Sequence, residues 1–168
     1  ATFEPDFPLG SFGREGIPAQ PAYVWIRNAT IWTSADAGII QNGEIVINAG
    51  KIVYVGAATT RAVPVDAIII DAAGRHVSPG LIDAHSHIAT DGGVNEGGQA
   101  ITCEVRIGDF IDSTDINIYR QLAGGVTTSN ILHGSANAIG GQNQVIKLRW
   151  GALPEQLKFE GAKPGVKF

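Results

Sequence analysis

Several residue types are scarce or absent in this chain of 168 residues. It contains no methionine and a single cysteine, Cys103, so no disulfide can form within it. A lone cysteine is more often a small buried or half-buried residue than a nucleophile, and we expect this of Cys103. No apolar run approaches the ~20 residues that a membrane-spanning helix needs, so we expect no membrane partner.

Charge is also sparse. Charged residues make up 17% of the chain and the formal net charge is -4, which leaves no basic surface suited to a phosphate backbone. We therefore expect no nucleic-acid partner. Hydrophobic residues make up 44% of the sequence, enough to bury a core in one ordinary domain or two small ones.

The first residue is Ala1 rather than methionine. A cleaved secretory signal would explain an alanine start and would place the protein in a secreted or periplasmic compartment. Truncation or proteolysis would explain it too, and the location would then be cytoplasmic. The sequence leaves both possibilities open.

The most informative stretch is residues 77–88, where a Pro-Gly break precedes apolar and polar residues that alternate. A two-residue period predicts a strand that carries Asp83, His85 and His87 on one face. Neutral imidazole is a common ligand of zinc, so this pair supplies half of a metal's first shell. At least one more ligand must come from elsewhere. Two hydrogen-bonded histidines in a core or at a surface are the alternative.

Residues 79–87, Pro-Gly-Leu-Ile-Asp-Ala-His-Ser-His, resemble the first barrel strand of the amidohydrolase superfamily. In that family, the His-x-His pair binds the more buried catalytic metal. The resemblance implies that His85 and His87 are ligands of a divalent metal, most often zinc, with one or two ions. Asp83 would orient a metal-bound histidine without contacting the metal itself, or would be a buried structural aspartate. The imidazolonepropionase and dipeptidase branch resembles the chain most.

The sequence divides into three regions. Residues 1–22 are rich in Pro, Gly and Phe without a period, which predicts an irregular arm. Residues 23–78 contain short β-branched and aromatic runs between turn signals, and resemble the small antiparallel β-sandwich domain of the family. Residues 79–168 resemble the start of its barrel. The predicted fold class is α/β: a partial TIM-type (β/α)8 barrel, first strands only, preceded by a β-sandwich.

Within residues 23–78, we expect strands that pair into an antiparallel sheet. Ala49-Gly50 is a hairpin signal between two of them, because glycine accepts a positive φ there. The predicted strands are 23–27, 30–32, 44–48, 51–55 and a buried strand at 67–71. In the family, this sandwich is completed by strands returned from the far C-terminus. A sheet without them has an open edge that invites association, so a homo-oligomer is possible.

Residues 89–113 show no sustained period and predict the loop after the first barrel strand, which would border the metal site. A flexible surface insertion is the alternative. A helix over about 114–123 with an apolar stripe at Ile116, Tyr119 and Leu122 follows, and then a strand over 126–133. Strand, helix and strand in this order predict a parallel β/α unit. We expect further strands at 144–150 and 165–168.

Two more residues are candidates for the site. His133 ends the second predicted strand and is a candidate for substrate binding, with a hydrogen-bonded structural role as the alternative. In many relatives, a carboxylated lysine on a later strand bridges two metals. Val166-Lys167-Phe168 bears a faint likeness to such a strand, and whether Lys167 has this role stays open.

The resemblance runs from about residue 23 to the end and covers less than half of a family member. The catalytic residue is unknown in this chain, because the expected aspartate and two further histidines would lie beyond residue 168. The implied reaction is metal-dependent hydrolysis of C–N bonds in amides, cyclic amides or dipeptides through an activated water. The implied partners are a small amide or peptide substrate and the remaining C-terminal half of the enzyme. We expect these residues alone to be inactive.

Two other functions are open at this point. A non-catalytic, β-rich binding or assembly module would retain the His-x-His without using it. A deaminase of the same superfamily would release a ring amine instead of cleaving an amide, and only later barrel residues distinguish that reaction.

Overall fold

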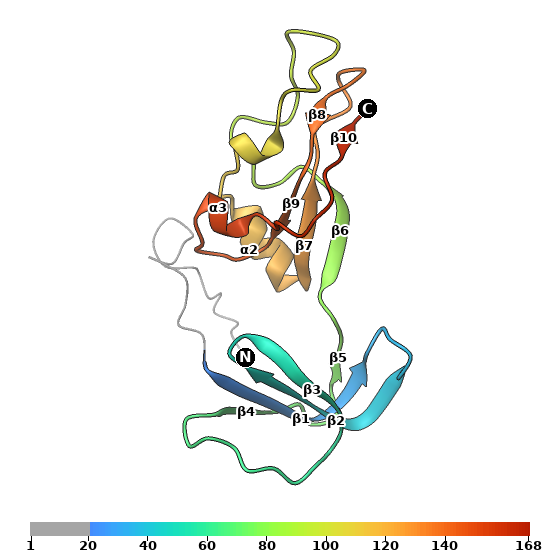
Figure 1. Cartoon of the computed structure of the whole chain (residues 1–168), viewed down its shortest axis with the longest axis vertical. Coiled ribbons are helices and arrows are strands. Elements are labelled where there is room, and N and C mark those ends of the chain that lie inside the picture. Colours follow the sequence, from blue (N-terminus) through green and yellow to red (C-terminus); the bar gives the residue numbers. More distant parts are fainter. Residues whose placement is uncertain (1–20) are drawn as a thin grey trace, which may run out of the picture. The chain divides into compact units, whose positions relative to one another are not determined.

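The computed structural model describes residues 21–168 (Figure 1). Nearly all of the predicted irregular arm, residues 1–22, lies outside this range. The described chain divides between Pro79 and Gly80 into an N-terminal unit and a C-terminal unit. Strands outnumber helices in both, so the chain is α/β with mostly β structure. No helix in the described range is long and apolar enough to cross a membrane.

The N-terminal unit is a five-stranded sheet in the order β3-β2-β1-β4, with β5 also paired to β1. The antiparallel neighbours are β1 with β2 and β2 with β3, whereas β4 and β5 run parallel to β1. The strands are β1 (Tyr23–Trp32), β2 (Ile39–Asn48), β3 (Lys51–Ala57), β4 (Ile68–Asp71) and β5 (His76–Val77).

The predicted hairpin is present between β2 and β3. Its two connecting residues, Ala49 and Gly50, have φ angles of 48° and 74°. Two consecutive positive φ angles are typical of the tight turn whose twist matches the flanking strands. Glycine at the second position adopts this conformation without steric cost.

Two strand predictions in this unit were wrong. The separate strands 23–27 and 30–32 are one strand, β1, in which Asn28 has a φ of 54° and the register to β2 shifts after Ile26. Asparagine tolerates the left-handed conformation, so it makes a bulge here rather than a strand end.

The strand predicted as buried at 67–71 is β4, and its side chains are exposed. Ile68, Ile69 and Ile70 expose 47%, 47% and 45% of their surface. This strand pairs with β1 alone and runs parallel to it, so the sheet is mixed rather than antiparallel. An apolar run identified β4 as a strand, but burial depends on which other elements cover the sheet.

The side chain of Glu44 on β2 is the main buried charge of the N-terminal unit, with the residue 0% exposed. Its carboxylate accepts hydrogen bonds from Trp25 Nε1 at 3.0 Å, Thr59 Oγ1 at 2.7 Å and Arg61 Nε at 3.0 Å. Burial by itself raises the pKa of Glu44, but the hydrogen bonds from Thr59, Arg61 and Trp25 together bring that pKa below its ordinary value. The carboxylate therefore stays ionised and ties β2 to β1 and to the segment after β3.

We predict that Glu44→Gln destabilises this sheet by about 1–3 kcal/mol at pH 7, because Arg61 keeps its burial but loses its charged partner. A folded-state pKa below the unfolded one gives stability that is present above about pH 4.3 and lost as the pH falls. The parent should therefore lose β2 amide protection against hydrogen exchange on acidification more steeply than Glu44→Gln. Asp66→Asn, at an exposed carboxylate of the same unit, is the control; equal acid sensitivity of the parent and Glu44→Gln would contradict the prediction.

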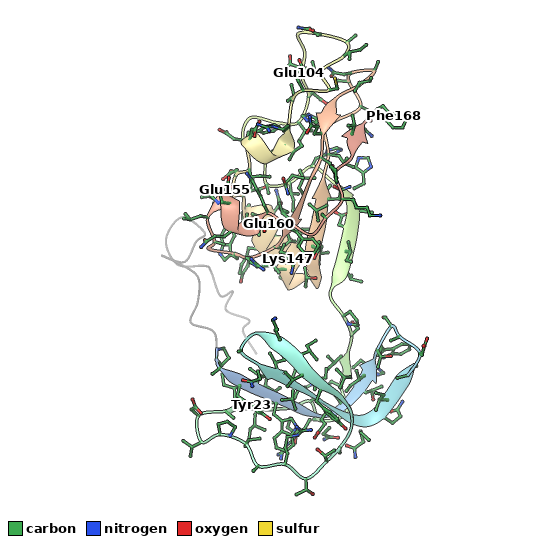
Figure 2. The ribbon with its side chains drawn as sticks, viewed as in Figure 1. Tyr23, Glu104, Lys147, Glu155, Glu160 and Phe168 are labelled. Atoms are coloured by element: carbon green, nitrogen blue, oxygen red, sulfur yellow. The ribbon has the colours of Figure 1, made fainter. Side chains whose placement is uncertain are left out.

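The C-terminal unit contains two small sheets. The larger has the order β6-β7-β9, with β6 and β7 parallel and β7 and β9 antiparallel, and the smaller pairs β10 with β8. Figure 2 labels Phe168, which lies beside β10 at the chain end. The strands are β6 (Leu81–Ser86), β7 (Val126–Ile131), β8 (Gly141–Gln142), β9 (Gln144–Lys147) and β10 (Val166–Lys167); the helices are η1 (Ile107–Asp109), α2 (Ile116–Ala123) and α3 (Pro154–Leu157).

Helix α2 connects β6 to β7, so the predicted parallel β/α unit is confirmed. Asp115 caps the helix, and its carboxylate accepts the backbone N–H of Asn117 at 2.9 Å. The second carboxylate oxygen accepts the N–H of Ala89 at 2.7 Å, which joins the helix start to the segment after β6. The fully buried residue of α2 is Ile118, whereas the predicted stripe residues are only partly buried.

The segment 89–113 is packed into the unit rather than extended from it. Ala89, Ile107 and Ile111 belong to its buried core, and Ile101 forms a bridge to Ile139. The flexible-insertion alternative is therefore not supported. Cys103 on this segment is exposed, so its predicted burial was wrong. It lies at a turn between two bridged positions, where the backbone is held but the side chain faces solvent.

Candidate functional site

The two histidines of the His-x-His pair lie side by side at the C-terminal end of β6. His85 is in the strand and His87 follows its last residue, and both are exposed. Their ring centroids are 5.0 Å apart with an interplanar angle of 83°. The two imidazole rings are therefore neighbours at an accessible position.

A hydrogen bond determines the tautomer of His87. Its Nδ1 lies 2.8 Å from the carbonyl oxygen of Leu132, just past the end of β7. A carbonyl can only accept, so Nδ1 carries the proton and the lone pair is on Nε2. Metal-binding histidines commonly donate their other ring N–H to such a carbonyl, which orients the ring and raises the basicity of the ligating nitrogen.

Among the described residues, no third metal-binding side chain is grouped with the histidine pair. Within residues 21–168, no group of three or more His, Cys, Asp or Glu side chains is arranged to hold an ion. His85 and His87 are therefore compatible with half of a zinc site, whose catalytic form takes three protein ligands.

Asp83 contacts the backbone of the pair rather than a ring. Its Oδ1 accepts the backbone N–H of His85 at 3.1 Å. On the neighbouring strand, Asn130 donates from Nδ2 to the carbonyl of Ala84 at 3.2 Å. Sequence reasoning missed Asn130. The alternation of residues along β7 did not indicate a role for Asn130, because this side chain contacts a backbone carbonyl of another strand.

His133 is 2% exposed, and its side chain packs against the backbone of Gly140 and Gly141. Its Nδ1 is 3.1 Å from the carbonyl oxygen of Val94, so Nδ1 carries the proton. Nε2 is buried without a hydrogen-bond partner among the described residues. In this part of the chain, no hydrogen bond or ring contact joins His133 to the histidine pair. Its role in substrate binding stays a prediction.

The backbone of Lys167 contacts the two glycines that pack against His133. Its carbonyl accepts the N–H of Gly140 at 2.8 Å, and Lys167 is paired with Gly141 between β10 and β8. The last strand of the chain is thereby joined to the glycine pair that packs against His133.

We predict that Gly141→Ala destabilises the C-terminal unit by about 1–3 kcal/mol, because Gly141 has a φ of 128° that side-chain-bearing residues rarely adopt. A Cβ there would also lie 2.4 Å from the oxygen of Val105 and 2.7 Å from Nε2 of His133. Urea denaturation measures the change. Gly97→Ala is the matched control, since a Cβ at Gly97 meets nothing within 4 Å; similar losses in both variants would contradict this account.

No protein-family model matches the chain. It is 37% identical over 144 residues to "Amidohydrolase tasK" of Hapsidospora irregularis, a match that covers 73% of this chain and 15% of that protein. An imidazolonepropionase of Idiomarina loihiensis is 40% identical over 67 residues, covering 40% of this chain and 16% of the relative. An adenine deaminase of Rubrobacter xylanophilus is 27% identical over 175 residues, covering 88% of this chain and 28% of the relative.

A solved structure has the same fold over most of the chain. The amidohydrolase from Thermotoga maritima MSB8 superposes with a TM-score of 0.71 at 33% identity, covering 82% of this chain and 37% of that one. The fold of the described residues is thus one found in an amidohydrolase. The chain belongs to the amidohydrolase superfamily. It spans between 15% and 28% of the length of the three curated relatives named above.

Proposed function

We propose that this chain is the N-terminal part of a metal-dependent hydrolase that acts on C–N bonds of amides, cyclic amides or dipeptides. The observation that carries the proposal is the proximity of His85 and His87, with ring centroids 5.0 Å apart at the end of a strand. The tautomer of His87 supports it further, because the bond from Nδ1 to Leu132 leaves Nε2 unprotonated and free to bind a cation.

In this proposal, residues 23–78 form the beginning of a β-sandwich and residues 79–168 the beginning of a (β/α)8 barrel. The parallel β6-β7 pair with α2 between its strands supports the barrel, because each barrel strand is followed by a helix. The isoleucines exposed on β4, together with the exposed Ile52, Val53 and Val55 of β3, support a sandwich that further strands complete. The rest of the enzyme would supply the remaining barrel strands.

Each site residue has a proposed role. His85 and His87 would hold a divalent cation, most often zinc, as two of its protein ligands. When bound, such an ion polarises a carbonyl and lowers the pKa of water towards 7. His133 would accept a hydrogen bond from substrate at Nε2, the buried nitrogen that has no partner in the described chain. An aspartate outside these residues would transfer the proton from water to the leaving nitrogen.

Deamination is a second candidate reaction. It is favoured by the similarity to an adenine deaminase, which extends over 88% of this chain. In that case, water would add to a ring carbon, the exocyclic C–N bond would break, and ammonia would leave. Ammonia release from an aminated ring would identify a deaminase, whereas a new carboxylate and amine from a dipeptide or cyclic amide would identify an amide hydrolase.

We predict that Co²⁺ added to the chain selectively broadens the imidazole NMR signals of His85 and His87, because the paramagnetic ion is bound by both. The sequence contains only four histidines, so all can be followed in one spectrum. His76, exposed in the N-terminal unit, is the internal control and should change only at much higher Co²⁺ concentration.

The variants His85→Ala and His87→Ala should each abolish the selective broadening, while His76→Ala should leave it unchanged. Two imidazoles do not complete a zinc shell, so we expect weak binding by these residues alone. Equal broadening of His76 and the pair, or no broadening of the pair at millimolar Co²⁺, would contradict the proposal. A non-catalytic binding or assembly module that does not use the histidine pair predicts no broadening of the pair.

A further inference from the structure

The pairing between β6 and β7 is irregular where the histidine pair begins. Asp83 is paired with Ser129, and the next pair along the strands is Ser86 with Ile131. The register therefore advances three residues on β6 but two on β7, which places one extra residue on β6 around Ala84 and His85. Such a bulge locally disrupts the ladder and re-aims the side chains next to it.

Side chains bond two backbone groups of this bulge. The N–H of His85 donates to Asp83 Oδ1 at 3.1 Å, and the carbonyl of Ala84 accepts from Asn130 Nδ2 at 3.2 Å. A backbone group displaced from a sheet ladder needs another partner. Asp83 and Asn130 supply these partners from opposite sides of the same peptide unit, the one that joins Ala84 to His85.

A second amide fixes the orientation of Asn130. Asn143 donates from Nδ2 to Asn130 Oδ1 at 2.6 Å, and its own Oδ1 accepts the N–H of Gly165 at 2.6 Å. These hydrogen bonds form a row that starts at the Gly165 N–H and ends at the Ala84 carbonyl. Because an N–H can only donate and a carbonyl can only accept, the two ends of the row determine both amide orientations. The amino group of Asn130 therefore points to the bulge, and its oxygen to Asn143.

We propose that Asp83 and Asn130 are positioning residues that hold the β6 bulge and thereby keep His87 beside the carbonyl of Leu132 at the end of β7. Successive side chains of a regular strand alternate between its faces, and a one-residue slip exchanges the faces. If the peptide between Ala84 and His85 returned to a regular ladder, the pairing of β6 with β7 beyond it would slip by one residue. Both histidines would then exchange faces, and His87 would lose its place beside Leu132. This inference rests on the proposed metal-binding function of the pair.

The test is the nuclear Overhauser effect (NOE) between the His87 imidazole protons and the protons of Leu132, measured without metal. Asn130→Asp removes the donor to Ala84 but keeps an acceptor for Asn143, so we expect a folded variant in which this NOE is lost. The control is Asn137→Asp, which removes a comparable amide donor, 2.7 Å from the carbonyl oxygen of Gln99, in the same unit. The control should retain the NOE.

The apparent affinity for Co²⁺ is measured in the same samples. Loss of an outer-shell partner typically weakens metal affinity 10–100-fold, and we expect about tenfold weaker binding in Asn130→Asp. If the parent chain fails to bind Co²⁺ at the pair, the proposed function is wrong, while the NOE still tests the bulge. If the NOE persists in folded Asn130→Asp, the positioning role is wrong, whatever the metal result.

Asp83 provides a second pair of variants in case Asn130→Asp does not fold. Asp83→Asn retains an oxygen that accepts the His85 N–H and should preserve the NOE. Asp83→Ala removes that acceptor and should lose it. A purely structural role predicts similar spectra for both variants of Asp83 once stability is allowed for, and that result would overturn the inference.

Discussion

The candidate site depends on the parallel pairing of β6 with β7. Parallel strands end at the same edge of a sheet, so the chain that follows β7 passes beside the histidines that end β6. This proximity allows the carbonyl of Leu132 to accept a hydrogen bond from His87 Nδ1. A backbone hydrogen bond from the Leu132 N–H to the Ser86 carbonyl joins the same two segments. Glycine is required at the start of β6, because a Cβ on Gly80 would lie 2.2 Å from Thr127 on β7.

Polar contacts specify much of this geometry. Glu44 accepts hydrogen bonds from three side chains in the N-terminal unit. In the C-terminal unit, Asn130 and Asn143 hydrogen-bond to each other. Each of these side chains bonds groups from segments that are distant in the sequence. A buried polar group costs free energy unless it is paired, so such contacts favour one arrangement of strands over its alternatives.

Local signals predicted much of the fold and the core of the site. The Ala49-Gly50 hairpin, helix α2 and the adjacency of His85 and His87 follow from turn chemistry and from periods of two and 3.6 residues. Contacts between distant segments were not predictable in this way. Examples are the exposure of β4, the burial of Glu44 and the amide pair Asn130-Asn143, each of which depends on what the neighbouring element presents.

The central claim is that His85 and His87 bind one cation through ring nitrogens. X-ray absorption spectroscopy of the zinc-loaded chain at the zinc edge tests it most directly. The account predicts imidazole scattering from two histidines at about 2.0–2.1 Å, reduced to one or none when either residue is alanine. A zinc environment made only of oxygen ligands, or one unchanged in both alanine variants, would contradict it.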